Sequence, residues 1–249
     1  MKRLFLNELS KLNSSGAYII FGIALLFYLM EYMVIHVDAY NVFSGDQTQL
    51  ELANYFLTNT TKNFNALLPI LIIVQVGNEL RGGILKKMLA DTYSRKEYFI
   101  AKLLMIVPIV LITLVFNYVF YLIYSSIYSG ESLLTIIGAY SLEYFLIFLL
   151  FTLVVSFLGL VFILLIKRKV LAIILCILYQ HVEIIVRGAG DNIEKVAFLS
   201  YAQYLPVNTI TQPSTQFLQQ FDRAGLAVFY IALMAVVSYL LIKRYQVKR

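Results

Sequence analysis

A series of long apolar stretches separated by short polar connections is the feature that most constrains this chain. A helix needs roughly 20 apolar residues to cross the hydrocarbon core of a bilayer. Because 61% of the 249 residues are hydrophobic and only 14% are charged, a soluble fold of this size could not bury so much apolar surface. The sequence therefore predicts an all-α polytopic membrane protein with six transmembrane helices, which we place at 17–35, 64–77, 100–124, 142–166, 170–186 and 226–242.

The second stretch is short for a spanning helix, so we extend it back through 60–63. The fourth and fifth stretches are separated only by Lys167, Arg168 and Lys169, which predicts a tight turn.

The distribution of Lys and Arg predicts the orientation, since basic residues concentrate in cytoplasmic connections. Sixteen of the twenty Lys and Arg residues fall in one set of connections, and that set contains both chain ends. An odd number of spans would put basic residues on both sides. The asymmetry thus favours six spans with both termini in the cytoplasm, in the cell inner (cytoplasmic) membrane. It also explains the net charge of +6 by attraction to anionic headgroups rather than to nucleic acid.

Three segments outside the spans have features of their own, within a single transmembrane domain over 1–249. Segment 1–15 places Leu4, Phe5, Leu9 and Leu12 on one helical face, as in an amphipathic helix lying in the membrane interface. Segment 78–98 is basic and cytoplasmic. Segment 187–225 is a long outer connection with apolar patches, so we expect it to be folded.

Several chemistries are excluded by missing residue types. The chain has no G-x-x-x-x-G-K-[ST] loop to hold phosphates and none of the H-E-x-x-H, G-x-S-x-G or paired-cysteine motifs. The one cysteine, Cys176, cannot form an internal disulfide, and two histidines with one cysteine nearly exclude a His/Cys metal site. We therefore predict no catalytic residues, no metal site and no cofactor in this chain.

Segment 78–98 carries the most informative pattern. Leu80, Ile84, Leu85, Met88 and Leu89 recur at helical spacing between basic residues, as in a short amphipathic helix at the membrane surface. Ser94 and Glu97 have the spacing of a capping box, which predicts that the next helix starts there. The alternative is a solvated basic loop with no further role, whose Lys and Arg residues simply reflect the preference of basic residues for cytoplasmic connections.

This segment resembles the ABC-2 type permease family, the membrane subunits of ATP-binding cassette exporters. The matching residues are Glu79, Arg81, Gly82, Gly83, Leu85, Leu89, Ser94, Arg95 and Lys102. The stretch 203–206 is similar to the family's Leu-Pro step in the last outer connection. Where the family has Gly-Thr in the turn and Pro two residues before the Ser, this chain has Gly83-Ile84 and Thr92.

The resemblance implies that segment 78–98 is the coupling helix, which docks into a separate ATP-binding subunit. Glu79, Arg81, Gly82, Gly83, Leu85, Leu89, Ser94 and Arg95 would then couple the chain to that ATPase. It further implies export along a path at the interface with a second permease, identical or related, with ATP and Mg²⁺ bound only by the partner ATPase. Membrane lipids surround the pair.

Four polar residues near the outer ends of spans are candidates for a gate or a substrate contact: Glu31, His181, Glu183 and Arg187. Charge in the bilayer is unfavourable, so such residues often mark a pathway. The alternative is an interfacial position or a pair within the chain, such as Glu183 with Arg187 at i,i+4. Asn117 and Gln180 are weaker candidates.

Two other functions stay open at this point. The chain could be a non-transporting membrane scaffold or an immunity protein that binds a toxin or partner through 187–225. A membrane-embedded enzyme is the third, and the missing motifs disfavour it. The sequence does not select a substrate.

Overall fold

The computed structural model describes residues 67–80, 94–128, 142–192, 205–206 and 221–244, together with positions 6, 8, 10, 22, 26 and 85. Every residue in this set is helical except Ser94, Lys167, Arg168, Leu205, Pro206 and Arg244. The described part of the chain is therefore all-α, as the sequence predicts. The remaining residues, among them Glu31, Arg81, Gly82, Gly83 and Leu89, lie outside the described part, as do the side chains of Asn117 and Arg187.

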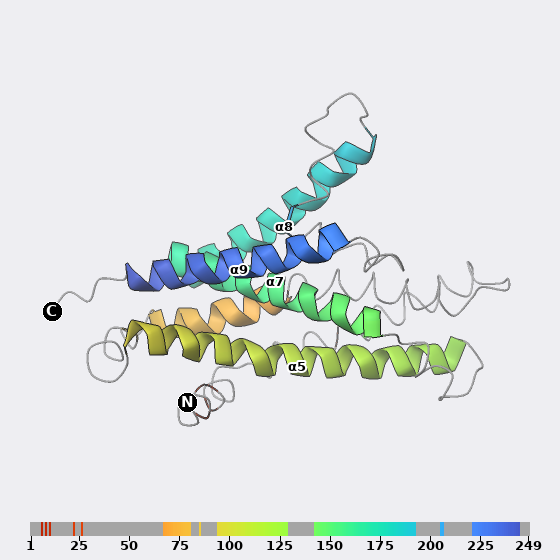
Figure 1. Ribbon diagram of the computed structural model, residues 1–249, viewed down its shortest axis with the longest axis horizontal. Coiled ribbons are helices and arrows are strands. Elements are labelled where there is room, and N and C mark those ends of the chain that lie inside the picture. Colours follow the sequence, from red (N-terminus) through yellow and green to blue (C-terminus); the bar gives the residue numbers. More distant parts are fainter. Residues whose placement is uncertain are drawn as a thin grey trace.

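Four long helices and one shorter helix are described over continuous stretches of the chain (Figure 1). They are Leu67–Leu80, α5 (Arg95–Tyr128), α7 (Leu142–Ile166), α8 (Lys169–Asn192) and α9 (Phe221–Lys243). The bounds of α7 are those predicted from the sequence. By contrast, α5 and α8 extend past the apolar stretches at 100–124 and 170–186, because helices continue into polar flanks where hydropathy alone gives no end. Arg187 consequently belongs to α8, and the connection before α9 runs from 193 to 220.

Three of these helices are long and apolar enough to cross a membrane: Arg95–Phe116 within α5, Leu149–Ile166 within α7 and Gly225–Lys243 within α9. Leu67–Leu80 is a shorter apolar helix. These lengths and compositions are those of a membrane protein.

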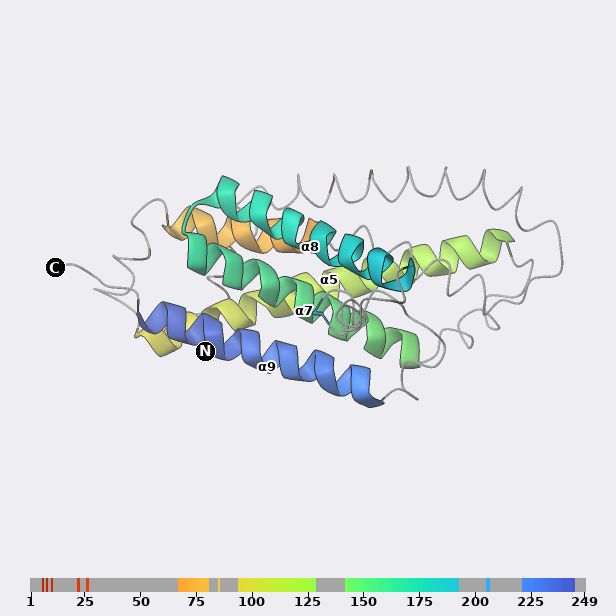
Figure 2. The ribbon, with the colours of Figure 1, turned by 90° about the horizontal axis from the view of Figure 1, so that it is seen from above.

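The central helix is α7, which contacts α5, α8 and α9 (Figure 2). Most of its span is buried, whereas fewer than a quarter of the residues in the α9 span are. The core around α7 contains Ile72, Ile106, Phe151, Val155 and Ile163, all buried. A helix that is apolar all round must be covered on every side, and the neighbouring helices cover most of the α7 span.

The outward faces of the helices are apolar. Val107, Leu111, Val115 and Val119 form an exposed stripe at i,i+4 spacing along α5. Polar side chains such as Gln75, Thr113 and Ser156 are buried instead. This pattern, apolar outside and polar inside, fits a bundle surrounded by lipid.

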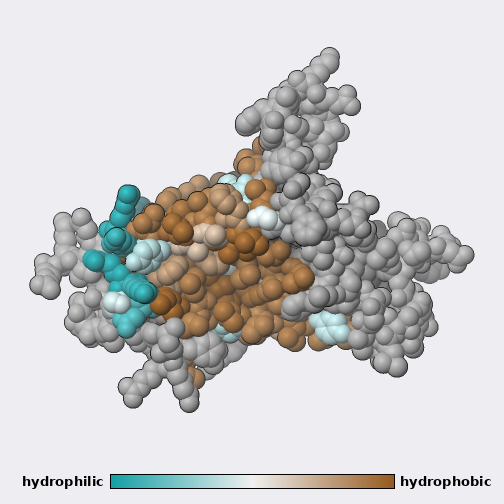
Figure 3. Space-filling model, viewed as in Figure 1, coloured by the Kyte–Doolittle hydropathy of each residue, from teal (hydrophilic) through white to brown (hydrophobic). Residues whose placement is uncertain are grey.

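Exposed basic residues gather at one end of the apolar surface (Figure 3). This end holds the start of α5, the α7–α8 turn and the end of α9, and its exposed basic residues are Arg95, Lys96, Lys167, Arg168, Lys243 and Arg244. Basic residues up to 149 positions apart in the sequence thus lie together at one end of the apolar surface, which we call the basic boundary of the apolar band.

Two glycines allow close helix contacts at α7 and the Leu67–Leu80 helix. A Cβ on Gly159 of α7 would lie 2.7 Å from the Cα and 2.8 Å from the carbonyl oxygen of Pro69. A Cβ on Gly77 would lie 2.2 Å from Cγ of Lys169, whose Nζ bonds the side-chain oxygen of Asn78 at 2.5 Å. Small residues let helix backbones approach closely, which favours association within a membrane.

We expect Gly159→Ala to lower the free energy of unfolding by about 1–3 kcal/mol, because backbone atoms of Pro69 cannot move aside as a side chain could. The matched control is Gly225→Ala in α9, where a Cβ would meet nothing within 4 Å. Thermal unfolding of both variants in the same detergent tests this expectation. Equal stability of the two would show that the close contact with Pro69 is absent.

The predicted tight turn between α7 and α8 consists of Lys167 and Arg168. Lys167 has φ = 61°, in the left-handed region, and its N–H donates to the carbonyl of Ile163 at 2.9 Å. This conformation ends α7, and Arg168 accepts from the N–H of Ala172 at 2.9 Å as α8 begins. A lysine at such a position bears a steric penalty that glycine lacks.

Lys167→Gly should therefore raise the free energy of unfolding by about 0.5–1 kcal/mol, despite the loss of a charge. Arg168→Gly removes the same charge from a residue without positive φ and serves as the control. Chemical or thermal unfolding compares the two. A variant at 167 that is no more stable than the one at 168 would contradict the expectation.

Candidate functional site

A buried group of charged and aromatic side chains lies where segment 78–98 joins the bundle. Lys102 of α5 is fully buried, and its Nζ donates to Oε2 of Glu8 and to Oε1 of Glu79, each at 2.7 Å. The hydroxyl of Tyr98 donates to the other oxygen of Glu79 at 2.7 Å. We call Glu8, Glu79, Tyr98 and Lys102 the buried ion cluster.

The members of the cluster supply hydrogen-bond partners to one another inside the bundle. An ammonium shared between two carboxylates gains two charge-assisted hydrogen bonds, which are shorter and stronger than neutral ones. The Nζ of Lys102 also lies 4.9 Å from the centroid of the Tyr98 ring, within the range of a cation–π contact. Because the charges are buried, removing one partner would leave another charge without compensation.

The helical spacing of α5 explains why Tyr98 and Lys102 meet. They are four residues apart and so lie on the same face of the helix, next to the buried Ala101 and Met105. That face is turned toward the bundle. Glu79 arrives from the penultimate position of the Leu67–Leu80 helix, and Glu8 from the N-terminal segment.

The predicted capping box at the start of α5 is confirmed. The N–H of Ser94 donates to Oε2 of Glu97 at 2.8 Å, and the N–H of Glu97 donates to Oγ of Ser94 at 3.2 Å. Ser94 is non-helical and α5 begins at Arg95, so two otherwise unbonded N–H groups are satisfied. Residues 94–97 are all exposed.

The two ends of segment 78–98, which we predict to contact an ATPase, are held next to each other. Glu79, near its start, and Tyr98, its last residue, are joined by a hydrogen bond, although they are 19 positions apart. Leu85, between them, is helical and 1% exposed, within the core of the bundle. Of the predicted coupling residues, Glu79 and Leu85 are thus buried, while Ser94 and Arg95 are exposed; Arg81, Gly82, Gly83 and Leu89 lie outside the described residues.

The chain matches no protein-family model, no curated protein and no solved structure at a significant level. Its resemblance to ABC-2 permeases remains a prediction from its residues.

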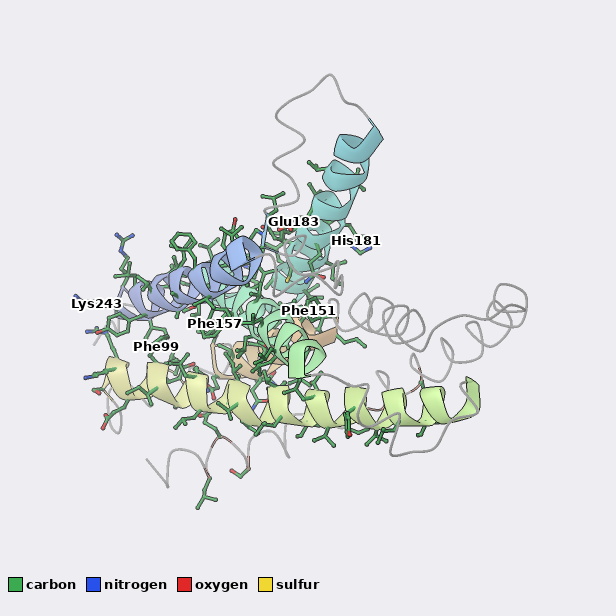
Figure 4. All side chains as sticks on the ribbon, turned by 45° about the vertical axis from the view of Figure 1, so that its right-hand side comes forward. Phe99, Phe151, Phe157, His181, Glu183 and Lys243 are labelled. Atoms are coloured by element: carbon green, nitrogen blue, oxygen red, sulfur yellow. The ribbon has the colours of Figure 1, made fainter. Side chains whose placement is uncertain are left out.

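The two predicted gate residues whose side chains the structure describes, His181 and Glu183, lie apart on α8. Glu183 is buried, whereas His181, two positions earlier on α8, is exposed and bonds the carbonyl of Ile177 through Nδ1 at 2.8 Å. Two residues on a helix are separated by about 200° of rotation, which places these side chains on opposite sides of α8. Figure 4 shows this separation. The side chain of Arg187, and Glu31, lie outside the described part of the chain.

The weaker candidate Gln180 is buried, and its Nε2 donates to Sγ of Cys176 at 3.7 Å. Glu183 follows Tyr179 by four positions, about one turn along α8, and its side chain is buried. Among the side chains that the structure describes, no three His, Cys, Asp or Glu residues are grouped so as to hold a metal ion.

Sequence reasoning missed Glu8 as a site residue, and it named Lys102 only as a basic residue of a cytoplasmic connection and as one of the positions that match the permease family. A signal was present for Lys102, because a lysine seven positions inside a long apolar helix requires a buried acidic partner. Nothing in the local sequence identifies Glu8 as that partner, since the contact spans 94 positions.

Lys102→Met should lower the free energy of unfolding by about 3–5 kcal/mol, because Glu8 and Glu79 would stay buried without their shared cation. The matched control is Lys96→Met, an exposed lysine on the same helix, for which we expect a change within about 0.5 kcal/mol. Thermal unfolding in detergent measures both. A loss in Lys102→Met no larger than in Lys96→Met would mean that the cluster does not hold the fold together.

Proposed function

We propose that the chain is the membrane-spanning permease subunit of an ABC-type exporter, driven by separate ATP-binding subunits. The observation that carries the proposal is the buried ion cluster at the base of segment 78–98. A segment that transmits force from an outside partner must be rigidly attached to the helices that it moves. Ion pairs in a site of low dielectric supply such an attachment.

In this proposal, six spans and an N-terminal interfacial helix lie in the cell inner membrane, with both termini in the cytoplasm. The support is the set of exposed Lys and Arg residues that share one boundary of the apolar band, as cytoplasmic boundaries do. Segment 78–98 would leave the membrane at that same boundary, since α5 begins there with Arg95 and Lys96 exposed.

The coupling residues then divide into two roles. Glu79 and Leu85 are buried, so they would position the segment, with Tyr98 and Lys102 as further positioning residues. Arg95, which is exposed, would contact the ATPase, together with the predicted coupling residues Arg81 and Leu89. ATP binding by the partner subunits would move the segment, and the cluster would pass this motion to α5 and to the Leu67–Leu80 helix.

A second permease, identical or related, would complete the substrate path at a shared interface. ATP and Mg²⁺ would be bound in the partner ATPases only, and this chain would bind or move its cargo without covalent chemistry.

The test is purification of the tagged chain from native membranes in mild detergent, with identification of copurifying proteins and an ATPase assay. We expect an ATP-binding protein to copurify with the parent and to be lost from an Arg81→Ala, Leu89→Ala variant. Glu79→Gln should retain the ATPase but reduce its stimulation by roughly 5–150-fold, the range of typical coupling free energies.

Glu97→Gln is the matched control for Glu79→Gln, because it removes the same charge from an exposed residue, and a glutamine can also complete the capping box. If no ATPase copurifies and all variants behave like the parent, the exporter proposal fails, and a scaffold or immunity protein becomes the function to pursue.

A further inference from the structure

The start of α5 and the end of α9 lie side by side at the basic boundary (Figures 1 and 2). The rings of Phe99 and Tyr239 make the contact, edge to face, with their centroids 5.4 Å apart. In Figure 4, Phe99 and Lys243 lie at the same end of the bundle. The contact therefore brings basic residues from two helices that are remote in sequence to one place.

Each helix carries an exposed lysine one turn nearer to the basic boundary than this pair of rings. Lys96 precedes Phe99 by three positions, and Lys243 follows Tyr239 by four. Residues at these spacings lie on the same side of a helix. The two exposed lysines thus lie on either side of the contact between α5 and α9.

The charge around this contact is mainly positive. Arg244, next to Lys243, is exposed as well. The described carboxylate nearest in sequence to Lys96 is Glu97, and its Oε2 accepts from the N–H of Ser94 in the capping box. An anion at the basic boundary would therefore meet an ammonium from each helix and a guanidinium from α9.

Both lysines are followed by apolar side chains that point away from the bundle. On α9, the exposed residues that follow Lys243 into the apolar band at helical spacing are Leu240, Val236, Leu233 and Phe229. On α5, the residues on the same side as Lys96 are Leu103, which is half-buried, and Val107 and Leu111, which are exposed. A cationic end thus continues into an apolar surface on each helix.

The length of the α9 surface matches one leaflet of a bilayer. At a rise of roughly 1.5 Å per residue, Phe229 is about 21 Å along the helix from Lys243. Half of the hydrocarbon core is about 15 Å thick, and the headgroup lies outside it. Of the three helices long and apolar enough to cross a membrane, α9 has the smallest buried share of its span, so this surface is open along most of its length.

We propose that this surface binds a phospholipid with an anionic headgroup. The phosphate accepts hydrogen bonds from Lys96, Lys243 and Arg244, and the acyl chains lie along the exposed apolar residues of α5 and α9. Hydrogen bonds between ionised partners are about twice as strong as neutral ones, and a guanidinium can bind phosphate through two of them. The site does not depend on the exporter proposal, since it needs only a bilayer around the chain.

The combination of charge and apolar surface selects this ligand. A zwitterionic lipid carries a cation of its own beside the phosphate, which the cations of the protein repel. An acidic soluble protein would match the charges, but it would leave the adjoining apolar residues of both helices without a partner. Only an anionic lipid complements both parts of the surface.

The experiment measures labelling of the purified full chain by photoactivatable lipids in phosphatidylcholine nanodiscs. The two probes are phosphatidylglycerol and phosphatidylcholine with a diazirine at the same acyl position, and mass spectrometry of peptides locates the label. We expect phosphatidylglycerol to label α5 and α9 about tenfold or more above phosphatidylcholine. The Lys96→Gln, Lys243→Gln variant should lower this ratio by about tenfold, because each cation near an anionic headgroup adds to the attraction.

The matched control is the Lys167→Gln, Arg168→Gln variant, which removes the same charge from the α7–α8 turn at the same boundary. It should keep the ratio of the parent, as should Lys96→Arg, Lys243→Arg, which keeps both cations. Equal labelling by the two lipids in the parent would overturn the proposal. So would an equal loss in both glutamine variants, since the attraction would then belong to the whole boundary.

A soluble partner on the same cations is a further outcome of the test. If Lys96→Gln, Lys243→Gln loses a copurifying ATP-binding protein while its lipid ratio stays that of the parent, these cations bind that protein and the lipid site is overturned. The exporter proposal fails separately, because the labelling needs no ATPase. A lipid preference that depends on both lysines, in a chain from which no ATPase copurifies, would support the lipid site and overturn the exporter.

Discussion

The shared cation of Lys102 is the interaction on which the rest of the arrangement depends. One ammonium binds Glu8 from the N-terminal segment and Glu79 from the end of the Leu67–Leu80 helix, and the Tyr98 hydroxyl donates to the second oxygen of Glu79. Three parts of the chain that are remote in sequence are thereby fixed at a single point. Hydrophobic burial cannot fix such a point, because apolar contact is non-directional and lipid competes for the same surfaces.

The contacts between the Leu67–Leu80 helix and the α7–α8 pair depend on close packing at two glycines. Because Gly159 has no side chain, Pro69 packs directly against the backbone of α7. Gly77 likewise leaves room for the aliphatic part of Lys169, whose ammonium donates to the side-chain oxygen of Asn78. Both contacts join the Leu67–Leu80 helix to the α7–α8 pair. The ion cluster joins the same short helix to α5. This helix thus contacts both α5 and the α7–α8 pair, although it is shorter than α5, α7, α8 and α9.

The sequence predicted much of the fold because bilayer dimensions limit what an apolar stretch can be. It placed both bounds of α7 and the capping box of Ser94 and Glu97, and it placed the tight turn at 167–169, of which Lys169 is already the first residue of α8. All of these follow from local patterns. It did not predict where α8 ends, because the helix continues through Gly188 and Gly190, residues that are typical of a helix end. It also missed the partnership of Glu8 with Lys102, because a contact across 94 positions depends on tertiary packing alone. Glu183 and His181 looked equivalent in sequence, and only the helix rotation separates them.

The two-residue turn at Lys167 and Arg168 has a mechanical consequence. It keeps the start of α8 next to the end of α7, and Lys169 at the start of α8 also donates a hydrogen bond to Asn78. A helix of 24 residues is about 36 Å long, so a rotation of about 10° about this base would carry its far end through about 6 Å. Glu183 would travel about 4 Å in the same rotation, enough to exchange one set of neighbours for another. A small rotation at the basic boundary would therefore produce a much larger displacement at the far end of α8.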